Sequence, residues 1–332
     1  MKRLVLTLSA LLLGFACPTV VCAQDLEWKT LNSQIMSFYR QGNYDRALAV
    51  AREALRIAEQ AGGPNHPLVA LSLNNLALLY KTQGQYAQAE PLYQRALEIK
   101  EKILGPDHPS VALSLNNLAE LCRAQGHFIQ AHLLYSRALK IKEKALGPDD
   151  LSVATSLNNL AALYEAQGQY AQAKPLYHRA LAIREKALGA NHLSVAASLD
   201  NLASVYGHEG QYPQAESLYR RALALRQIAL GFENSQVAAS LHNLAALYTA
   251  QRRYVEAEPL YEQSLTMCEK TLGRDHPSVA ASLEGLATLY RNTGRSNEAA
   301  ALENRAAAIR AQHERKAPLD KMQRAAFPAG LE

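Results

Sequence analysis

Two apolar stripes with helical spacing alternate along most of the chain. Starting at Leu73, apolar residues recur at positions i, i+3, i+4 and i+7, which is the spacing of one face of an amphipathic helix. Gly84 then interrupts the pattern, and a second apolar stripe runs from Tyr86 to Ile103. It ends at Gly105, which is followed by proline, a combination that terminates helices. The pattern predicts two antiparallel helices joined by a tight turn.

This pair of stripes returns every 42 residues. The string Leu-Asn-Asn-Leu-Ala begins at Leu73, Leu115 and Leu157, and close variants of it begin at Leu199, Leu241 and Leu283. One step back, the related string Leu-Asn-Ser begins at Leu31, and no insertion or deletion breaks the register. We therefore predict seven repeats over residues 24–315, at about 26–67, 68–109, 110–151, 152–193, 194–235, 236–277 and 278–315.

The small residues of each repeat indicate how the helices pack. Ala77, Ala89 and Ala96 leave room for neighbouring helices to approach closely, and tyrosines such as Tyr93 fill the remaining gaps. A single hairpin cannot bury both of its apolar stripes, so each repeat is stable only against its neighbours. The sequence therefore predicts an all-α protein, an α-solenoid of seven helix-turn-helix repeats.

The repeat resembles a known family. Leu76-Ala77, Tyr80, Gly84, Tyr86, Ala89, Tyr93 and Ala96 are similar to the signature of the tetratricopeptide repeat (TPR). The 42-residue period and the linker Leu104-Gly105-Pro106-Asp107-His108-Pro109 resemble the kinesin light chain subfamily more closely. The resemblance implies a right-handed superhelix whose inner wall is formed by the first helix of each pair. It does not imply a motor subunit, because the sequence contains no long heptad segment.

The first 23 residues have the order of a secretory signal peptide. Lys2 and Arg3 precede an apolar stretch that ends at Ala16, and small residues follow. This stretch is too short to cross a bilayer comfortably as a permanent helix. We expect cleavage after Ala23, with Ala16 as the alternative point and an uncleaved anchor as the alternative reading. The protein is then exported, periplasmic or secreted, with no integral membrane span after removal of the signal.

The four cysteines fall into two groups, one near the amino terminus and one within the repeats. Cys17 and Cys22 raise the possibility of lipidation, but Gly14 and Thr19 stand where bacterial lipoproteins usually carry leucine three residues earlier. Export permits disulfides. However, Cys122 and Cys268 lie in different repeats, which a solenoid holds far apart. We expect these two to be free, buried thiols.

Composition and motifs argue against several functional classes. The net charge of the 332 residues is +5, with no run of five like charges, so no nucleic-acid partner is expected. No phosphate-binding glycine-rich loop, metal-binding histidine pair or nucleophile elbow is present, so we expect no enzyme activity, cofactor or metal. Four histidines recur in the linkers, where we expect them to help turn the chain into the next helix: His66, His108, His192 and His276.

Asparagines within the first helix of the repeats are the strongest candidates for binding residues. Asparagine is a poor helix former, and its amide offers two donors and an acceptor to an extended peptide. The alternative is a structural role, in which each amide bonds a backbone carbonyl of the adjoining helix. Both roles are compatible. The resemblance implies peptide-binding asparagines at the matching positions, and the candidates are Asn74, Asn75, Asn116, Asn117, Asn158, Asn159, Asn201 and Asn243.

Charged residues next to these asparagines suggest what a ligand would carry. Arg40, Lys81 and Arg123 make the early part of the predicted groove basic, whereas Glu165 and Asp200 make its middle acidic. We therefore expect an acidic stretch of a ligand against the early repeats. The alternative is that all five are solvated side chains without a binding role.

Residues 316–332 follow the last repeat and form either a capping helix or a frayed tail. The leading interpretation of the whole chain is a protein–protein interaction scaffold that binds an extended peptide or protein segment in its groove. A structural spacer or assembly factor of the cell envelope, using its outer face or its ends, is the alternative. The sequence identifies neither the partner nor the oligomeric state.

Overall fold

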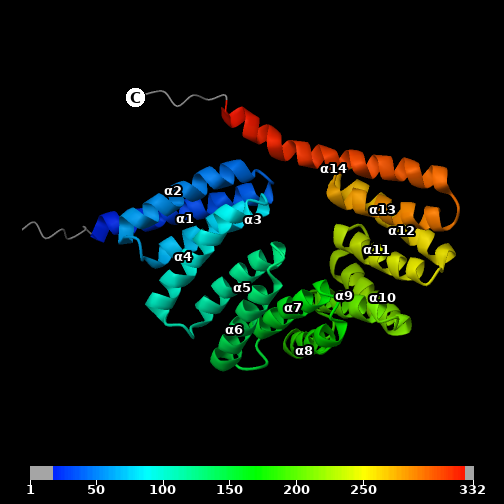
Figure 1. The fold of residues 1–332 in the computed structure, drawn as a ribbon, viewed down its shortest axis with the longest axis horizontal. Helices are drawn as coiled ribbons and strands as arrows, with labels where there is room; N and C mark the ends of the chain where they lie inside the picture. The colour runs from blue at the N-terminus through cyan, green and yellow to red at the C-terminus, as the bar shows by residue number, and fades with distance from the viewer. Residues whose placement is uncertain (1–17, 326–332) are drawn as a thin grey trace, which may run out of the picture. The chain divides into compact units, whose positions relative to one another are not determined.

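A computed structural model of the chain describes the backbone of residues 18–325 and the side chains of residues 25–312. Most of the predicted signal peptide, including Cys17, and residues 326–332 lie outside the described backbone. Across residues 18–325 the chain forms fourteen helices and no strand (Figure 1). The helices are α1 Pro18–Arg40, α2 Tyr44–Gly62, α3 Pro67–Thr82, α4 Tyr86–Leu104, α5 Pro109–Ala124, α6 Phe128–Leu146, α7 Leu151–Ala166, α8 Tyr170–Leu188, α9 Leu193–His208, α10 Tyr212–Leu230, α11 Ser235–Ala250, α12 Tyr254–Leu272, α13 Pro277–Asn292 and α14 Ser296–Ala325.

Consecutive helices pack in pairs, so each odd-numbered helix and the even-numbered helix after it form one hairpin. Within each hairpin, the turn needs a residue with positive φ, and glycine occupies this position in six turns, for example Gly84 at +70°. In the turn between α11 and α12, Arg252 adopts φ of +59° instead. A side chain with a β-carbon is unfavourable there, which makes this turn the one exception to the glycine rule.

Polar side chains cap the amino-terminal ends of the first helices from α3 onward. The Nδ1 atoms of His66, His108, His192 and His276 accept hydrogen bonds from backbone N–H groups two residues later. Asp150 and Asn234 cap their helices in the same way. The expectation that the linker histidines turn the chain into the next helix is confirmed, and the contact that does it is an N-cap.

The described helices form two compact units, one up to Gly105 and one from Pro106 onward. The first unit contains α1 to α4. Its core includes Ile35, Leu48 and Leu73, and the indole Nε1 of Trp28 donates a buried hydrogen bond of 2.7 Å to Ser72 Oγ. This bond joins α1 to α3, the first helices of successive hairpins.

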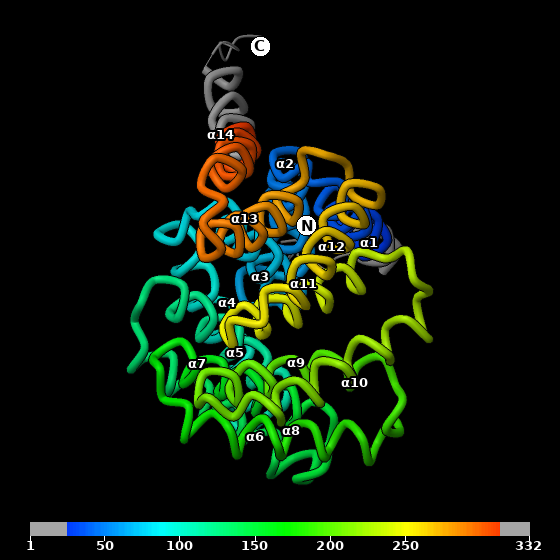
Figure 2. The backbone as a smooth tube through the Cα atoms, turned by 90° about the vertical axis from the view of Figure 1, so that its right-hand side faces the viewer, coloured from blue at the N-terminus to red at the C-terminus, as the bar shows by residue number. Residues whose placement is uncertain are grey.

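The second unit contains the five hairpins from α5 to α14, which follow one another in chain order (Figure 2). Alanines such as Ala161 and Ala203 are fully buried where helices approach closely, and Tyr135 and Tyr177 are buried between neighbouring hairpins. First helices contact the first helix of the next hairpin, as α7 contacts α9 and α9 contacts α11. Small and large side chains therefore divide the packing as the sequence predicts.

The last helix extends beyond the repeat pattern. α14 runs without interruption from Ser296 to Ala325, so the first residues of the predicted tail continue it (Figure 1). At the other end, α1 begins at Pro18, ahead of the predicted cleavage point. Among the described residues, no helix has the length and apolarity needed to span a membrane.

Candidate binding face of the first helices

The first helices of the second unit expose small side chains. Ala197 on α9, Ala239 on α11 and Ala281 on α13 recur at the repeat step and are exposed. Further along, Ala246 on α11 and Thr288 on α13 are exposed as well. We call this surface of α7, α9, α11 and α13 the first-helix face. Its small side chains leave the half-buried amides beside them accessible.

Asparagine amides connect successive first helices. In the first unit, Asn75 Nδ2 on α3 donates to Asn32 Oδ1 on α1 at 2.5 Å. In the second unit, Asn201 Nδ2 on α9 donates to Asn158 Oδ1 on α7 at 2.7 Å. The second asparagine of one repeat thus bonds the first asparagine of the repeat before it. We call these asparagine–asparagine bonds between successive first helices the amide ladder. Each bond uses one of the two N–H groups of the donor amide, so an amide in the ladder keeps capacity for a ligand.

The other candidate asparagines have different surroundings. Asn74 Nδ2 donates to the carbonyl of Ala70 within its own helix, at 2.9 Å. Asn116 is buried, only 7% exposed, and its Nδ2 lies 3.4 Å from Ser156 Oγ. Asn117, Asn159 and Asn243 are half-buried on α5, α7 and α11. Where an asparagine amide is seen to join two first helices, its partner is a side chain of the adjoining helix rather than the backbone carbonyl that the sequence suggested.

The three basic candidates divide between the two units. Arg40 is exposed in the last turn of α1, and Lys81 is half-buried in the last turn of α3. Arg123, in the last turn of α5, forms an ion pair with Glu120 in which Nη2 and Oε1 are 2.6 Å apart. The structure thus places Arg40 and Lys81 on first helices of one unit and gives Arg123 an internal partner.

The acidic candidates also have internal partners. Glu165 accepts hydrogen bonds of 2.7 Å from the hydroxyls of Tyr177 and Ser204. Asp200 pairs with Arg226, with Oδ2 and Nη2 2.6 Å apart and both side chains largely buried. Burial raises the pKa of Asp200 in spite of the opposing effect of Arg226. The expected acidic middle of the face is therefore a pair of carboxylates engaged in holding helices together.

A recurrent serine marks a connection between a second helix and the first helix of the next hairpin. The side chain of Lys142 on α6 extends into the space between α6 and α7. There its Nζ donates to Ser156 Oγ at 2.9 Å and to the carbonyl of Ser152 at 3.1 Å. Arg184 bonds Ser198, and Arg226 bonds Ser240, in the same register. We call this space, containing a first-helix serine and the side chain fourteen residues before it, a socket.

The residues that form these sockets were not among the candidates suggested by the sequence. Lys142 is only 7% exposed, and burial lowers the pKa of its ammonium group. In the sequence of a single helix, such a residue cannot be distinguished from a lysine or arginine that faces solvent. The available signal was their recurrence: the serines repeat at Ser72, Ser114, Ser156, Ser198, Ser240 and Ser282, and the cations at Lys100, Lys142, Arg184 and Arg226.

The second helices are joined by ion pairs instead. Arg179 pairs with Glu143 at 2.6 Å and Arg221 pairs with Glu185 at 2.7 Å, each linking one second helix to the previous one. Arg305 and Glu269 repeat the arrangement between α14 and α12. Successive first helices are therefore joined by amides, and successive second helices by ion pairs.

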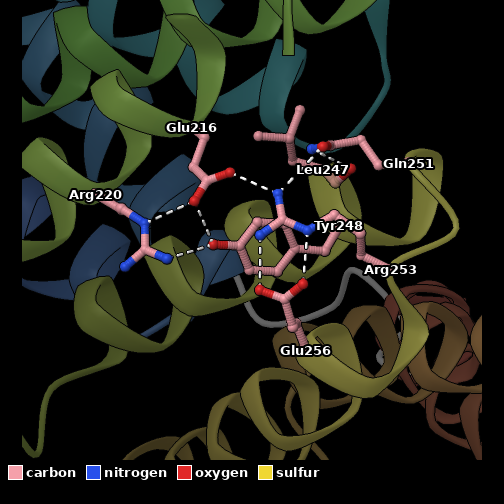
Figure 3. Close-up of polar contacts among 7 residues, drawn as sticks. All are labelled: Glu216, Arg220, Leu247, Tyr248, Gln251, Arg253 and Glu256. Atoms are coloured by element: carbon pink, nitrogen blue, oxygen red, sulfur yellow. Dashed lines mark hydrogen bonds and ion pairs between the residues drawn. The ribbon is translucent and has the colours of Figure 1, made fainter. Parts of the chain in front are cut away.

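A larger charge cluster lies where α10 meets the turn before α12 (Figure 3). Arg253 donates to Glu216 and Glu256, and its guanidinium carbon lies 4.1 Å from the centre of the Tyr248 ring. The Tyr248 hydroxyl donates to Glu216 at 2.8 Å and accepts from Arg220 at 2.7 Å. These contacts connect α10 of one hairpin with α11 and α12 of the next.

The cysteines and the side-chain types that bind metals are the remaining candidates for chemistry. Cys122 and Cys268 form no disulfide and are both buried, which confirms the expectation from the sequence. Within the described part of the chain, no group of three or more histidine, cysteine, aspartate or glutamate side chains is placed to hold a metal ion.

Comparison with known families gives one match. A family model described as Tetratricopeptide repeat matches residues 29–102, 82–144, 147–228 and 236–312. A search of curated proteins gives no significant match.

Solved structures include several similar chains. A kinesin light chain-like protein from Podosopora anserina, with nearly identical TPR-like repeats, is 33% identical over 62% of this chain and 98% of its own, with a TM-score of 0.55. BtubC (BKLC) from P. vanneervenii is 25% identical over 73% of this chain and 92% of its own, with a TM-score of 0.57. A Rap protein in complex with Competence and Sporulation Factor shares the fold at 17% identity and a TM-score of 0.62, over 86% of this chain and 76% of its own.

Proposed function

Because the chain belongs to the tetratricopeptide repeat family, whose members generally mediate protein–protein interactions, we propose that it is a scaffold that binds an extended polypeptide segment on its first-helix face. The observation that carries the proposal is the amide ladder beside exposed small side chains. Bonds such as that from Asn201 to Asn158 orient the amides, and residues such as Ala197 and Ala246 leave them accessible. Proteins with this fold are generally non-catalytic, and the proposal requires no reaction.

The amides are suited to recognising a backbone rather than a particular sequence. An asparagine offers donors and an acceptor at a spacing that an extended peptide matches with its own N–H and C=O groups. Because the ladder bonds hold the side chains in place, less conformational entropy is lost when a peptide binds. The amides would thus position a peptide along successive first helices.

The free energies of hydrogen bonding and of association show that other residues must contribute to binding besides the amide ladder. Each net hydrogen bond contributes about 0.5–1.5 kcal/mol. Association costs roughly 4–15 kcal/mol in lost freedom. A few amides therefore cannot supply the affinity alone. Selectivity has to come from positions that differ between repeats, among them Lys81 in the first unit and Ser204 and Thr249 in the second.

A crosslinking pull-down from the envelope fraction of the native host tests the proposal. The bait is wild type or a triple variant with Asn159→Ala, Asn201→Ala and Asn243→Ala, which lie on α7, α9 and α11 of that face. The matched control is Arg179→Ala, Arg221→Ala and Arg305→Ala, which removes three ion pairs of the second helices. We expect a discrete set of proteins that the amide variant loses and the control keeps. Capture by all three baits would favour a spacer or assembly role through an outer face or an end.

We further propose that the protein works outside the cytoplasm, periplasmic or secreted. The support is the basic start, the short apolar stretch and the small residues of the first 23 positions. Amino-terminal sequencing of the protein isolated from the envelope fraction should give a chain beginning at Gln24. An unprocessed chain in the cytoplasm would overturn this part of the proposal and leave the binding face untouched.

A further inference from the structure

The socket between α11 and α13 differs from those before it. In the register where Lys142, Arg184 and Arg226 fill their sockets, α12 carries Cys268. Its sulfur lies 4.0 Å from Ser282 Oγ, the serine that corresponds to Ser156. A thiol is several atoms shorter than a lysine or arginine side chain and carries no charge. This socket therefore lacks the cation that its equivalents hold.

A cavity of about 150 Å³ occupies this position. Ser264 and Cys268 on α12 line it together with Ser282 on α13 and with His242 and Asn243 on α11. Ser264 replaces the buried alanine that earlier second helices carry, and its hydroxyl lies 3.2 Å from that of Ser282. The space that a cation fills elsewhere in the chain is here open and lined by hydroxyl, thiol, amide and imidazole groups.

The imidazole of His242 lacks the partner that its register provides elsewhere. In the amide ladder, the residue at this position accepts a bond from the next repeat, as Asn158 accepts from Asn201. The corresponding residue after His242 is Gly285, which has no side chain, and His242 Nδ1 is buried without a hydrogen-bond partner. A buried polar atom of this kind favours any ligand that can bond it.

The charges around the cavity suit a cation. Burial lowers the pKa of His242, so near neutral pH the ring is uncharged, and with its proton on Nε2 it offers Nδ1 as an acceptor. The carboxylate of Glu284 on α13 is close enough to oppose that shift, and it is paired with Arg310 on α14. Tyr261 on α12 packs its ring edge-on against His242 at 5.2 Å between ring centres. Among the described residues that line the cavity, none carries a cationic side chain.

We propose that the socket formed by His242, Cys268 and Ser282 is a binding site for a primary ammonium group, supplied by a lysine side chain of a bound polypeptide. An ammonium group has three donors and no acceptor, which matches a lining of hydroxyl oxygens and an imidazole nitrogen. Lys142 shows the same chemistry within this chain, bonding a serine hydroxyl and a backbone carbonyl. The ammonium site stands on the cavity alone, whereas a polypeptide as its source rests on the proposed function.

Protection of Cys268 from a thiol reagent tests the ammonium site in the wild-type protein. Methyl methanethiosulfonate, which is uncharged, modifies the thiol, and peptide mapping follows Cys268 and Cys122 separately. We expect n-butylammonium at about ten times its Kd to slow modification of Cys268 by about tenfold, because the occupied site excludes the reagent. Tetramethylammonium, a cation without N–H donors, and 1-butanol, which is uncharged, should not protect. Equal protection by 1-butanol, or none by n-butylammonium, would overturn the site.

Two variants change which socket is open: the first fills the socket at Cys268, and the second opens the socket at Lys142. n-Butylammonium should raise the melting temperature of the wild-type protein, because it binds the folded state. Cys268→Lys supplies an internal ammonium in the manner of Lys142, so the amine should not raise the melting temperature of this variant. Lys142→Cys combined with Ala138→Ser and Asn116→His reproduces the open socket between α7 and the hairpin before it, because position 116 corresponds to His242. The thiol introduced at position 142 should then be protected by the amine. If Cys268→Lys does not fold, the wild-type protection and the second variant still decide. A Cys268→Lys protein that responds to the amine as wild type does would contradict the proposal.

Two peptides distinguish the source of the ammonium group. Ala-Ala-Lys-Ala-Ala with blocked ends is compared with its norleucine twin and with n-butylammonium. Protection by the lysine peptide at about tenfold lower concentration than n-butylammonium supports a polypeptide source, because backbone contacts add to the ammonium contact. Protection by both at the same concentration keeps the ammonium site and removes the polypeptide as its source. Equal protection by the norleucine twin would overturn the site.

Discussion

The sockets at Arg226 and Cys268 occupy the same position in successive hairpins and are built in opposite ways. Arg226 bonds Ser240 and pairs with Asp200, so its socket contains its own cation and its own counter-ion. At the next step Cys268 and His242 replace Arg226 and Asp200 while the serine is kept as Ser282, and a cavity of about 150 Å³ is left. The comparison indicates that the repeat tolerates loss of the internal cation, and that stability and ligand access can be distributed unevenly along one solenoid.

Breaking the buried pair in the filled socket should have the largest effect. Arg226→Ala leaves Asp200 buried without a partner, which costs about 3–5 kcal/mol for a buried ion pair. At the open socket, Cys268→Ala removes only a sulfur atom and should cost about 1 kcal/mol. Urea denaturation followed by circular dichroism measures both. Replacing both partners, with Asp200→Asn and Arg226→Met, should recover most of the loss. Equal costs at the two sockets would contradict the comparison.

Gly285 should be essential to the open socket although it lies in mid-helix. A β-carbon at Gly285 would lie 2.5 Å from Tyr261 Cε1 and 2.9 Å from His242 Cε1. Gly285→Ala should therefore cost about 1–3 kcal/mol through overpacking. The matched control is Gly207→Ala on α9, where the nearest atom is Leu247 Cδ1 at 3.4 Å. The control should gain up to about 1 kcal/mol from helix propensity. Melting temperatures that rise in both variants would show that the ring atoms yield.

The His242 imidazole should make the open socket sensitive to acid. Burial lowers its pKa below the ordinary value of 6.5, so the unfolded chain binds a proton more readily than the folded protein. Stability is then fully present above pH 6.5 and falls as the pH drops toward the folded pKa. His242→Asn should weaken this loss between about pH 7 and pH 5, measured as the urea midpoint at each pH. An unchanged pH dependence in the variant would assign the effect to other groups, such as His178.

The smallest effect is expected at the charge cluster around Arg253. Glutamine replaces arginine at the corresponding positions 85, 169 and 211, so Arg253→Gln restores the common residue of the repeat. Its ion pairs with Glu216 and Glu256 are partly exposed to solvent and therefore screened by salt, and pairs of this kind contribute little. The variant should change the urea midpoint less than any of the preceding ones, and less in high salt than in low salt. A larger loss than that of Gly285→Ala would show that the cluster holds the hairpins together.

The sequence predicted the helices and the repeat because both depend on local patterns. Apolar spacing and glycines such as Gly84 mark helices and turns residue by residue, and the one turn without glycine, at Arg252, still adopts positive φ because the packed hairpin requires it. The pairing of Asn158 with Asn201 was not predictable, because it depends on the offset between two helices in contact. Lys142 was missed for a related reason, since a long amphipathic side chain can equally face solvent or reach below a neighbouring helix.

Photo-crosslinking from single positions tests the central claim, that the first-helix face binds polypeptide. Ala246 is exposed on α11, within that face, and Ala224 is exposed on α10, on a second helix. The photoreactive residue p-benzoylphenylalanine is introduced at each position in the native host. The account predicts adducts with polypeptide partners from position 246 and none from position 224. Adducts from position 224 alone would contradict it and place the binding surface on the second helices.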